Sequence, residues 1–515
     1  MRRKPLIIAV LVIVAVLGIG AYLFVRTMLG SDFVRSTLEQ QLSSRLGQPV
    51  RIGSASAAIF PRVAVDLHDV SIGGENGILA NELHVVTGLR GLLSRTVTDA
   101  EVVVRDGRVP LPLPFSLAAA DSGPASRREG TAPPAASEAS SGGLTIASVR
   151  LIALRNVALV AGTGQIVVDA DSAIDGDRLR ISRLSARAQA TRVEAEGELT
   201  SMSAFQGRLA ARADPLDLDE LVAFASAATS RPAEPTTTAA ADAPGASMRL
   251  VIELTAPAGS FTTYTFNDLS TTLEVAGGRV MLAPLSVKTF GGSFQGSLEA
   301  NTGGSVPRLT LKGRLDGLDV PALLKASGSP GGITGQLAGT VALRAAGAGT
   351  AAIVETAQGS IDISVTSGNI PGLDMVRTLV LAFGKPSGAP PEGSGTAFSR
   401  IGGRFELADG VLSSDNIALA SRDFDMAANG SLRLATGAVN ARADIVLSKE
   451  LTNQAGTDLR RYAQEDGRVV VPATIGGTLQ SPRVTPDIAA ATRRAVGNEL
   501  KRRVKTLIDD LFKKR

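Results

Sequence analysis

Apolar and polar residues alternate along most of this chain with a period of two. The clearest run is Ser360 to Thr366, in which Ile361, Ile363 and Val365 are separated by polar residues. Because successive side chains of a β-strand point to opposite faces, the alternation predicts half-buried strands with one aliphatic and one solvent-facing side, as in antiparallel sheets. The aliphatic positions of four such runs are Leu250, Ile252, Leu254, Leu309, Leu311, Ile361, Ile363, Val365, Ile445 and Leu447.

The predicted strands recur in a fixed order of turn, strand and short helix. Gly-containing turns occur at 175–177, 277–279 and 409–410, and polar-Gly-polar-Leu elements at 196–199, 295–298, 429–432 and 476–479. Asp217, Asp319 and Asp374 each precede a few apolar residues, and an Asp in this place fits a helix N-cap. The repeated order predicts stacked supersecondary modules. Independent reuse of glycine turns, which is common in β-proteins, is the alternative.

The longest apolar run lies at the start of the chain. Residues 6–25 carry no charge and follow Arg2, Arg3 and Lys4. At about 1.5 Å per helical residue the run would cross a hydrocarbon core of roughly 30 Å, with the cationic tail in the cytoplasm. A cleavable signal peptide is the alternative, although its apolar core is normally about 7 to 15 residues and no clear A-x-A site follows. The anchoring residues would be Leu6, Ile7, Ile8, Val10, Leu11, Val12, Ile13, Val14, Val16, Leu17, Ile19, Leu23, Phe24 and Val25.

Two further helices are expected outside the repeats. The first covers 32–46, with Leu38, Leu42 and Leu46 on one side, and ends at Gly47. The second covers 486–515 and combines an apolar stripe with a basic face. It would either lie on an anionic bilayer surface or cap the last strand. Its basic residues include Arg493, Arg494, Lys501, Arg502, Arg503 and Lys505.

Two segments, 116–143 and 225–247, contain almost no large aliphatic residues and have the composition of disordered linkers. They divide the chain into consecutive regions. These are a tail and anchor (1–30), an N-terminal helix with strands (31–115), a β-repeat module (144–224), further β-repeat modules (248–485) and the basic amphipathic helix (486–515).

Composition narrows the chemistry. The chain has no Cys, so neither disulfides nor thiolate sites are available, and aromatic residues make up only 3%, with no Trp. Positive charge is concentrated at the two ends, and the body between them is mildly acidic. A nucleic-acid-binding surface along the body is therefore not expected.

The candidate catalytic and cofactor motifs are weak. Residues 347–352 satisfy a G-x-G-x-x-A pattern, but a dinucleotide site also needs a βαβ unit, which the surrounding alternation does not predict. His68 and His84 are the only histidines, and both fall at strand-surface positions. We therefore expect no cofactor, no metal and no enzymatic activity.

The chain resembles the AsmA family of bacterial envelope proteins, whose larger relatives include the TamB-like proteins. The resemblance rests on short motifs in order. They are Gly47-Gln48-Pro49-Val50-Arg51-Ile52, Phe60-Pro61-Arg62-Val63, Gly317-Leu318-Asp319-Val320, Gly359-Ser360-Ile361-Asp362, Gly372-Leu373-Asp374 and the ending Val471-Pro472-Ala473-Thr474. It implies an inner-membrane, periplasm-facing protein with a long curled antiparallel sheet, a β-groove of repeated modules with short capping helices.

Two functions follow from these expectations. The first is transport of phospholipid along an apolar groove lined by the aliphatic positions named above, in support of outer-membrane homeostasis, with the inner membrane and phospholipids as partners. A closed core formed by the same side chains is the structural alternative. The second function is a scaffold or assembly factor for outer-membrane or other envelope proteins, acting through exposed strand edges.

Overall fold

The structure is a computed structural model of the 515-residue chain. It describes residues 31–58, 62–74, 76–88, 96–115, 145–146, 148–229, 248–304, 306–328, 331–347, 349–383, 391, 393, 395–454, 464–465, 467–487, 489–490 and 493. The chain forms two compact units. The first comprises 1–262 and 272–278, and the second comprises 263–271 and 279–515.

The first unit is a sheet of long strands with two helices. Its helices are α2 (Ser31–Leu46) and α4 (Leu218–Thr229). Its strands are β1 (Val50–Ala58), β2 (Val63–Ile72), β3 (Ile78–Thr87), β4 (Thr96–Val97), β5 (Ala100–Leu111), β6 (Thr145–Ile146), β7 (Ser148–Ala161), β8 (Gly164–Asp175), β9 (Arg178–Arg187), β10 (Arg192–Ser201), β11 (Gln206–Ala213), β12 (Leu216–Asp217) and β13 (Arg249–Phe261). The strand β14 (Tyr264–Ala276) is divided between the two units.

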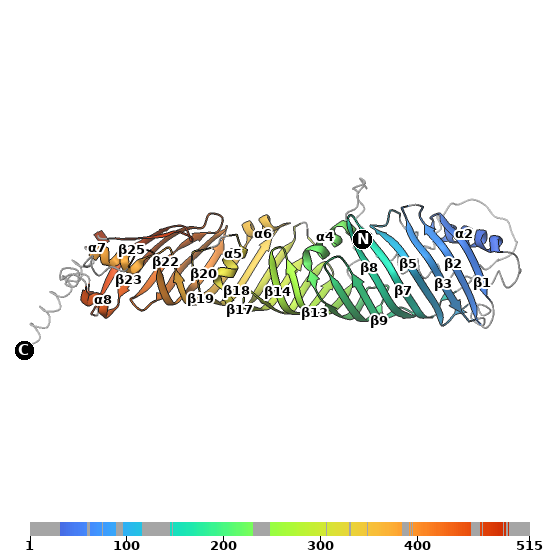
Figure 1. Cartoon of the computed structure of the whole chain (residues 1–515), viewed down its shortest axis with the longest axis horizontal. Helices are drawn as coiled ribbons and strands as arrows, with labels where there is room; N and C mark the ends of the chain where they lie inside the picture. The colour runs from blue at the N-terminus through green and yellow to red at the C-terminus, as the bar shows by residue number, and fades with distance from the viewer. Residues whose placement is uncertain are drawn as a thin grey trace, which may run out of the picture. The chain divides into compact units, whose positions relative to one another are not determined.

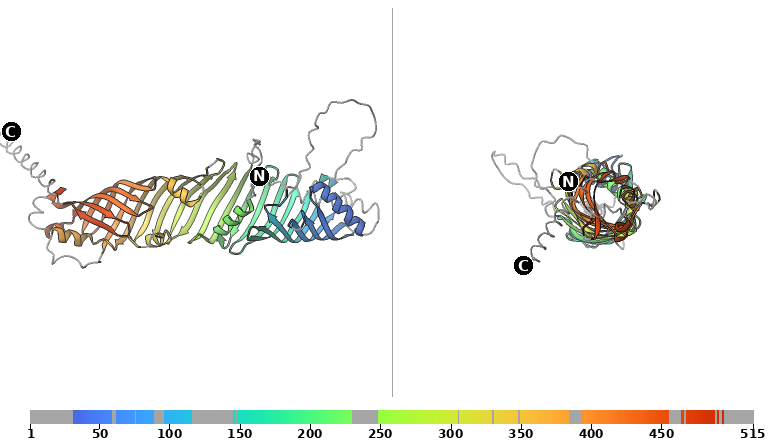
Figure 2. Two further views of the ribbon diagram at one scale, coloured as in Figure 1. Left: turned by 90° about the horizontal axis from the view of Figure 1, so that it is seen from above. Right: turned by 90° about the vertical axis from the view of Figure 1, so that its left-hand side faces the viewer.

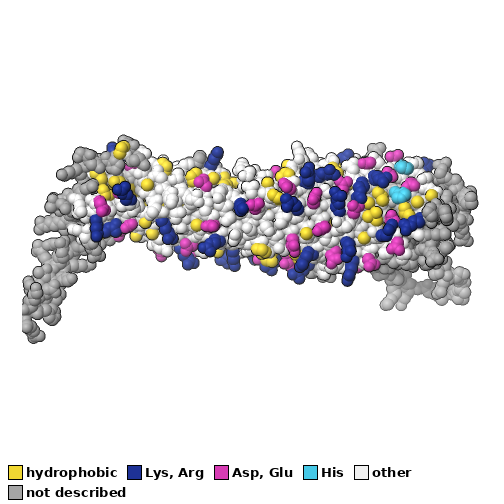
Figure 3. Space-filling view, turned by 60° about the horizontal axis from the view of Figure 1, so that its bottom comes forward, with side chains coloured by type: hydrophobic (Ala, Val, Ile, Leu, Met, Phe, Trp, Pro, Cys, Tyr) yellow, Lys and Arg dark blue, Asp and Glu magenta, His cyan; other side chains and the backbone are white. Residues whose placement is uncertain are grey.

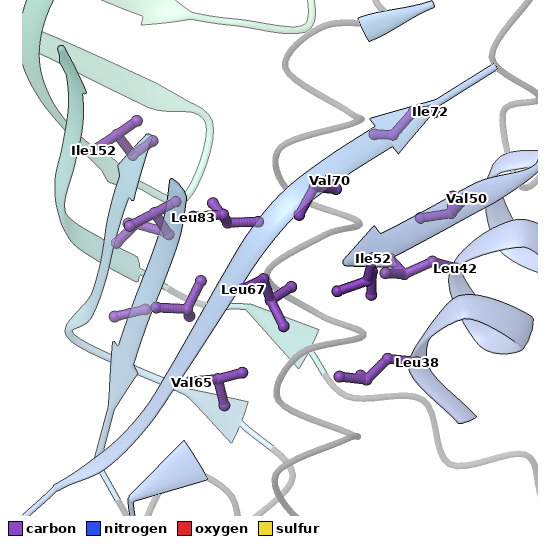
Figure 4. Close-up of a cluster of buried hydrophobic side chains, with 14 of the residues drawn as sticks. Leu38, Leu42, Val50, Ile52, Val65, Leu67, Val70, Ile72, Leu83 and Ile152 are labelled. Atoms are coloured by element: carbon purple, nitrogen blue, oxygen red, sulfur yellow. The ribbon is translucent and has the colours of Figure 1, made fainter. Parts of the chain in front are cut away.

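The core of the first unit lies where α2 covers the sheet (Figure 4). Leu38 and Leu42 of α2 point toward Ile52 of β1 and Leu67 of β2, and these four side chains are at most 3% exposed. The helix forms as the sequence predicts, with its leucines at helical spacing and Gly47 in a left-handed conformation (φ 63°) just after its end.

The second unit is a further series of strands with short helices at the strand ends (Figure 1). Its strands are β15 (Arg279–Thr289), β16 (Gly292–Asn301), β17 (Arg308–Asp319), β18 (Gln336–Ala346), β19 (Gln358–Ile370), β20 (Thr396–Ala408), β21 (Val411–Ala420), β22 (Phe424–Arg433), β23 (Ala438–Leu447), β24 (Gln464–Glu465), β25 (Arg468–Gly477) and β26 (Pro482–Pro486). Its helices are α5 (Val320–Ala326), α6 (Thr350–Thr356), α7 (Met375–Phe383) and α8 (Lys449–Gln454).

The sheet of the second unit curls back on itself (Figure 2). The turn between β25 and β26 reaches the connection that precedes β18, since a Cβ built on Gly332 would lie 2.8 Å from the carbonyl oxygen of Leu479. The same turn passes Gly372, just before α7. Because two strand ends far apart in sequence meet here, the apolar face between them is enclosed at this end of the strands.

The sheets are mixed, which corrects the expected antiparallel sheet. Most neighbours are antiparallel, but β5 pairs with β7, and β11 with β13, in parallel register. Antiparallel neighbours can be joined by a tight turn, whereas parallel neighbours need a crossover of a dozen or more residues. Both parallel pairs are separated by the long segments of low aliphatic content, which supply that crossover.

The repeated order of turn, Gly–Leu strand and Asp-led helix is confirmed in full for two copies, whereas α7 precedes the turn and the Gly–Leu strand of the third copy. The predicted turns end β8, β14 and β20, and the Gly–Leu elements lie within β10, β16 and β22. The fourth element, 476–479, is different, because it falls at the end of β25 and in the following turn. The Asp-led helices are α4, α5 and α7. The predicted linker at 225–247 begins late, since α4 continues to Thr229.

Several expectations fall outside the described residues. These are the apolar run at 6–25, the linker at 116–143, the rest of the linker after 229, and nearly all of the basic helix at 486–515. Among the helices that the structure does describe, none has the length and apolar character needed to cross a bilayer.

Candidate functional site

A row of positions that are mostly leucine crosses the second unit from β15 to β23, one position on each strand. Strand register places these residues opposite one another on successive strands, which puts them on one face of the sheet. The members of this row, named here the leucine row, are Leu282, Leu298, Leu311, Leu343, Gly359, Leu407, Leu412, Leu432 and Val439. All of its leucines except Leu407 remain half-buried.

A second row runs parallel to the first on the same face and is sealed. This core row consists of Leu318, Leu337, Val365, Ile401, Leu419, Met426, Ile445 and Val471. All of its members except the half-buried Ile401 are at most 8% exposed. Met375 and Leu379 of α7 pack into the same cluster, with Leu323 and Leu324 of α5 against it. The apolar face is therefore closed along one row and partly open along the other.

The two rows lie near different ends of the strands. The core row is next to the helix edge, defined as the strand ends that carry α5, α7 and α8. The leucine row is next to the turn edge, defined by the connections 302–307, 347–357, 409–410 and 434–437. The turn edge carries one short helix, α6, between β18 and β19.

An aspartate begins each helix that the repeat predicted. The Asp319 carboxylate accepts the backbone N–H of Ala322 at 2.8 Å, which makes it the N-cap of α5. Asp217 accepts the N–H of Glu220 at 2.9 Å at the start of α4. Asp374 instead accepts the N–H groups of Gly393 and Gly395, at 2.7 and 2.6 Å. These carboxylates therefore accept backbone hydrogen bonds at the strand ends where the short helices begin.

Between the two rows an aromatic ring covers part of the apolar face. Phe294 on β16 lies over Gly313 of the neighbouring strand, and a Cβ added there would stand 2.4 Å from the ring. Glycine is required because the ring occupies the space of any side chain at this position. Leu315, opposite Phe294, packs against the core cluster.

The leucine row and the core row contain no ionisable side chain. The residues between them on β17, β18 and β19 of this face are also apolar, for example Val341 opposite Ile361. An isolated charge on such a surface loses hydration without gaining a partner. The face is therefore suited to hydrocarbon and not to a charged ligand group.

The first unit has a similar aliphatic face between β8 and β13. Ile174, Leu179, Leu199, Gly207 and Leu250 are consecutive partners across five strands. The next rungs pair Leu209 with Ile252 and Ala211 with Leu254, and all four are half-buried. Alanine is frequent here, so this face has less apolar bulk than that of the second unit.

The opposite faces of the strands carry charges of both signs (Figure 3). In the first unit Glu101 receives hydrogen bonds from Arg150 and, at 2.7 Å, from Arg62, and these hold the pKa of the carboxyl below its usual value. The backbone N–H of Asn156 at 2.9 Å, with Arg187, lowers the pKa of Asp169 in the same way. Paired, exposed charges of this kind are hydrated, so this outer surface faces solvent.

The predicted lining residues divide into two groups. Leu309, Leu311 and Ile361 are half-buried near the turn edge, and Leu250, Ile252 and Leu254 are half-buried in the first unit. Val365, Ile445 and Leu447 are at most 8% exposed within the sealed core, and Ile363 packs against that core. One part of the predicted lining is therefore half-buried, as in the open groove, and the other part is buried, as in the closed core.

Several lining positions were missed by the alternation argument. Leu298 and Leu432 were visible in the sequence as the last residue of the Gly–Leu element, but their place on the same row as Leu311 was not. Leu282, Leu343 and Leu412 had no comparable signal, because strand register is not encoded in local alternation.

The other candidate sites are structural. His84 bonds through Nδ1 to Asp66 across β2 and β3, and His68 is exposed on the same sheet surface. Residues 347–352 join β18 to α6, and β18 and β19 are antiparallel, which excludes the parallel βαβ unit of a dinucleotide fold. In the described part of the chain, no three His, Asp or Glu side chains gather closely enough to hold a metal ion.

Of the basic residues named for the C-terminal helix, Arg493 is the one that lies within the described residues. Arg493 is exposed, and its Nε donates to the carbonyl of Ala489 at 3.4 Å. Arg494, Lys501, Arg502, Arg503 and Lys505 lie outside the described residues, as do the anchoring residues from Leu6 to Val25.

Each of the two units is thus a β-sheet with one aliphatic face. Comparison with known families agrees with this class. The model of the AsmA family matches residues 175–417, which contain most of the leucine row and the strands β9 to β20, so this central region is similar to the AsmA family. Neither the curated proteins nor the solved structures include a significant match.

Proposed function

We propose that this protein binds the acyl chains of phospholipids on the half-buried face of its second unit. The observation that carries the proposal is the leucine row, which presents aliphatic side chains on eight of nine successive strands, with Gly359 on β19 and no interrupting charge. Each methylene group removed from water contributes about 0.8 kcal/mol. A chain of roughly sixteen carbons would therefore gain on the order of 10 kcal/mol before the cost of ordering it is subtracted.

The proposed setting is the bacterial envelope. The match to the AsmA family supports a role in outer-membrane assembly or lipid transport. The apolar run at 6–25 supports a single-pass anchor in the inner membrane with the body in the periplasm. In this proposal no covalent bond is made or broken, and the partners are the inner membrane, phospholipids and other envelope proteins.

A tryptophan reporter tests acyl-chain binding directly. The chain has no Trp, and Phe405 is half-buried opposite Ile361 on the apolar face. Full-length Phe405→Trp in detergent is titrated with phosphatidylcholine that carries bromine atoms on its acyl chains. Because bromine quenches indole fluorescence only at contact, saturable quenching is the expected result.

The matched control places the reporter on the opposite face. Thr340 lies on the exposed side of β18, opposite Asp362. Thr340→Trp should keep its fluorescence under the same titration. Equal quenching of both reporters, or none in Phe405→Trp, would contradict binding on the apolar face.

The alternative function, a scaffold that recruits partner strands to its sheet edges, has weaker support. Two backbone N–H groups of the edge strand β1 are already bonded, Val50 to Ser43 Oγ at 2.9 Å and Ile52 to Glu39 Oε1 at 2.8 Å. The last strand, β26, begins and ends with proline, which has no N–H to donate. Such features protect edges against strand addition.

A further inference from the structure

The turn edge of the second unit combines exposed arginines with exposed aliphatic side chains. Arg308 begins β17 and Arg344 lies near the end of β18, both exposed on the outer face of the sheet. Arg308 is opposite Ala346 and Arg344 is opposite Thr310, so the two arginines are diagonal neighbours. Diagonal neighbours on one face stand about 7 to 8 Å apart at their Cα atoms, close enough for both guanidinium groups to reach one anion.

Neither arginine is neutralised locally. Within the described residues no ion pair joins Arg308 or Arg344 to a carboxylate, whereas Glu299 on the neighbouring strand is engaged by Arg279 at 2.7 Å. The described residues of 301–307 and 347–357, which adjoin these two strands, include one acidic residue, Glu355 of α6. The edge therefore keeps a local excess of positive charge.

Two exposed apolar side chains lie in the connections next to these two arginines. Val306, in the connection before β17, and Val354 of α6 are each 50% exposed. The backbone N–H of Gly347 donates to the carbonyl of Pro307 at 2.9 Å, which ties the two connections together. Exposed aliphatic groups beside unpaired cations match the junction between headgroup and acyl chain of an anionic lipid.

The turn edge adjoins the part of the apolar face that carries the leucine row. Leu309 follows Arg308 directly and Leu343 precedes Arg344, and both leucines belong to the aliphatic side of their strands. A charged headgroup cannot lie on the apolar face, which offers it no partner. The helix edge is occupied by α5, α7 and the sealed core. The turn edge is therefore the side on which a headgroup remains in water while its chains lie on the leucine row.

We propose that Arg308 and Arg344 bind the phosphate group of a glycerophospholipid whose acyl chains lie on the leucine row. This assignment rests on the acyl-chain binding proposed above and adds the place and chemistry of headgroup recognition. Arginine suits this role because its planar guanidinium donates two parallel hydrogen bonds to phosphate oxygens.

The test uses the full-length Phe405→Trp protein and two brominated probes. One is phosphatidylglycerol, and the other is diacylglycerol with the same acyl chains and no phosphate. The variant carries Arg308→Gln and Arg344→Gln together. Its half-saturation for phosphatidylglycerol should rise about tenfold, equivalent to roughly 1.4 kcal/mol, while that for diacylglycerol stays unchanged.

The control variant removes the same charge away from the edge. Lys312 and Arg314 are exposed on the outer face in the middle of β17. The double variant Lys312→Gln and Arg314→Gln should bind both probes as the parent does. Equal affinity of the edge variant and the parent for phosphatidylglycerol would overturn the headgroup assignment, as would an equal loss in the control variant. Failure of the parent to bind either probe would instead overturn acyl-chain binding itself.

Discussion

Leu337 and Leu343 point to the same face of β18, but only Leu337 is buried. Leu337 is 7% exposed and lies between Leu318 and Val365 in the core row, whereas Leu343 is half-buried in the leucine row. At about 3.3 Å per residue the two side chains are roughly 20 Å apart along the strand. One strand thus contributes both to the core that holds the fold and to the surface that we propose for lipid.

Charged substitutions at these two leucines should separate stability from binding. Leu343→Asp should abolish quenching by brominated lipid in the Phe405→Trp protein, because a carboxylate would stand among the acyl chains, with only a small loss of stability. Leu337→Asp should destabilise the second unit by several kcal/mol, since it buries an unpaired charge. Lipid quenching and thermal unfolding followed by circular dichroism measure the two effects. Equal destabilisation by both substitutions would show that the leucine row is core.

The sequence predicted the strands well because alternation is a local property. Ile361, Ile363 and Val365 fall on one face as expected, and the aspartates at 217, 319 and 374 lie at the starts of helices. The degree of burial along that face was not predictable. Val365 is sealed in a cluster with Met375 and Leu379 of α7 and with Val471 of β25, which lies about 100 residues further along the chain.

The relative direction of neighbouring strands could also not be predicted from the local sequence pattern. The alternation in β11 and β13 is the same whether the two strands run parallel or antiparallel, and the crossover through α4 decides the direction. The headgroup edge was missed for a related reason. Arg308 and Arg344 are distant in sequence, and only the pairing of β17 with β18 brings them together.

Removal of the Asp319 side chain should loosen α5. Asp319→Ala deletes the bond to the N–H of Ala322, and loss of such an N-cap costs about 1 kcal/mol. Hydrogen exchange of the amides in α5 should therefore accelerate by roughly fivefold, measured by mass spectrometry on the intact chain. Asp316→Ala, an exposed change on the same strand, is the control. Unchanged exchange in Asp319→Ala would mean that α5 is held by packing alone.

The turn between β8 and β9 should weaken in acid through Asp177. Its carboxylate accepts hydrogen bonds from Ser201 Oγ at 2.6 Å and from the N–H and Oγ of Ser203 at 3.0 and 2.9 Å, which lower its pKa. A lowered pKa stabilises the fold above the unfolded value of about 3.9 and loses that contribution as pH falls through the folded value.

Asp177→Asn should therefore lower the melting temperature slightly at pH 7, and the gap to the parent should narrow as pH falls below about 4. Thermal melts across this range measure the gap. Asp175→Asn, an exposed change beside the same turn, is the control. A gap that stays constant with pH would show that the Asp177 charge does not stabilise the turn.

The edge strand β1 should self-associate when side chains of α2 no longer accept hydrogen bonds from its backbone N–H groups. Glu39 and Ser43 accept the N–H groups of Ile52 and Val50, so Glu39→Ala with Ser43→Ala leaves both part-buried donors without their side-chain partners. Unpaired strand edges recruit other strands, and the expected result is concentration-dependent self-association in sedimentation velocity. The control, Gln40→Ala with Ser44→Ala, changes exposed side chains of the same helix. If the edge variant sediments like this control at every concentration, then the hydrogen bonds from α2 are dispensable and β1 is protected by other means, such as the burial of Val50 and Ile52 beneath the helix.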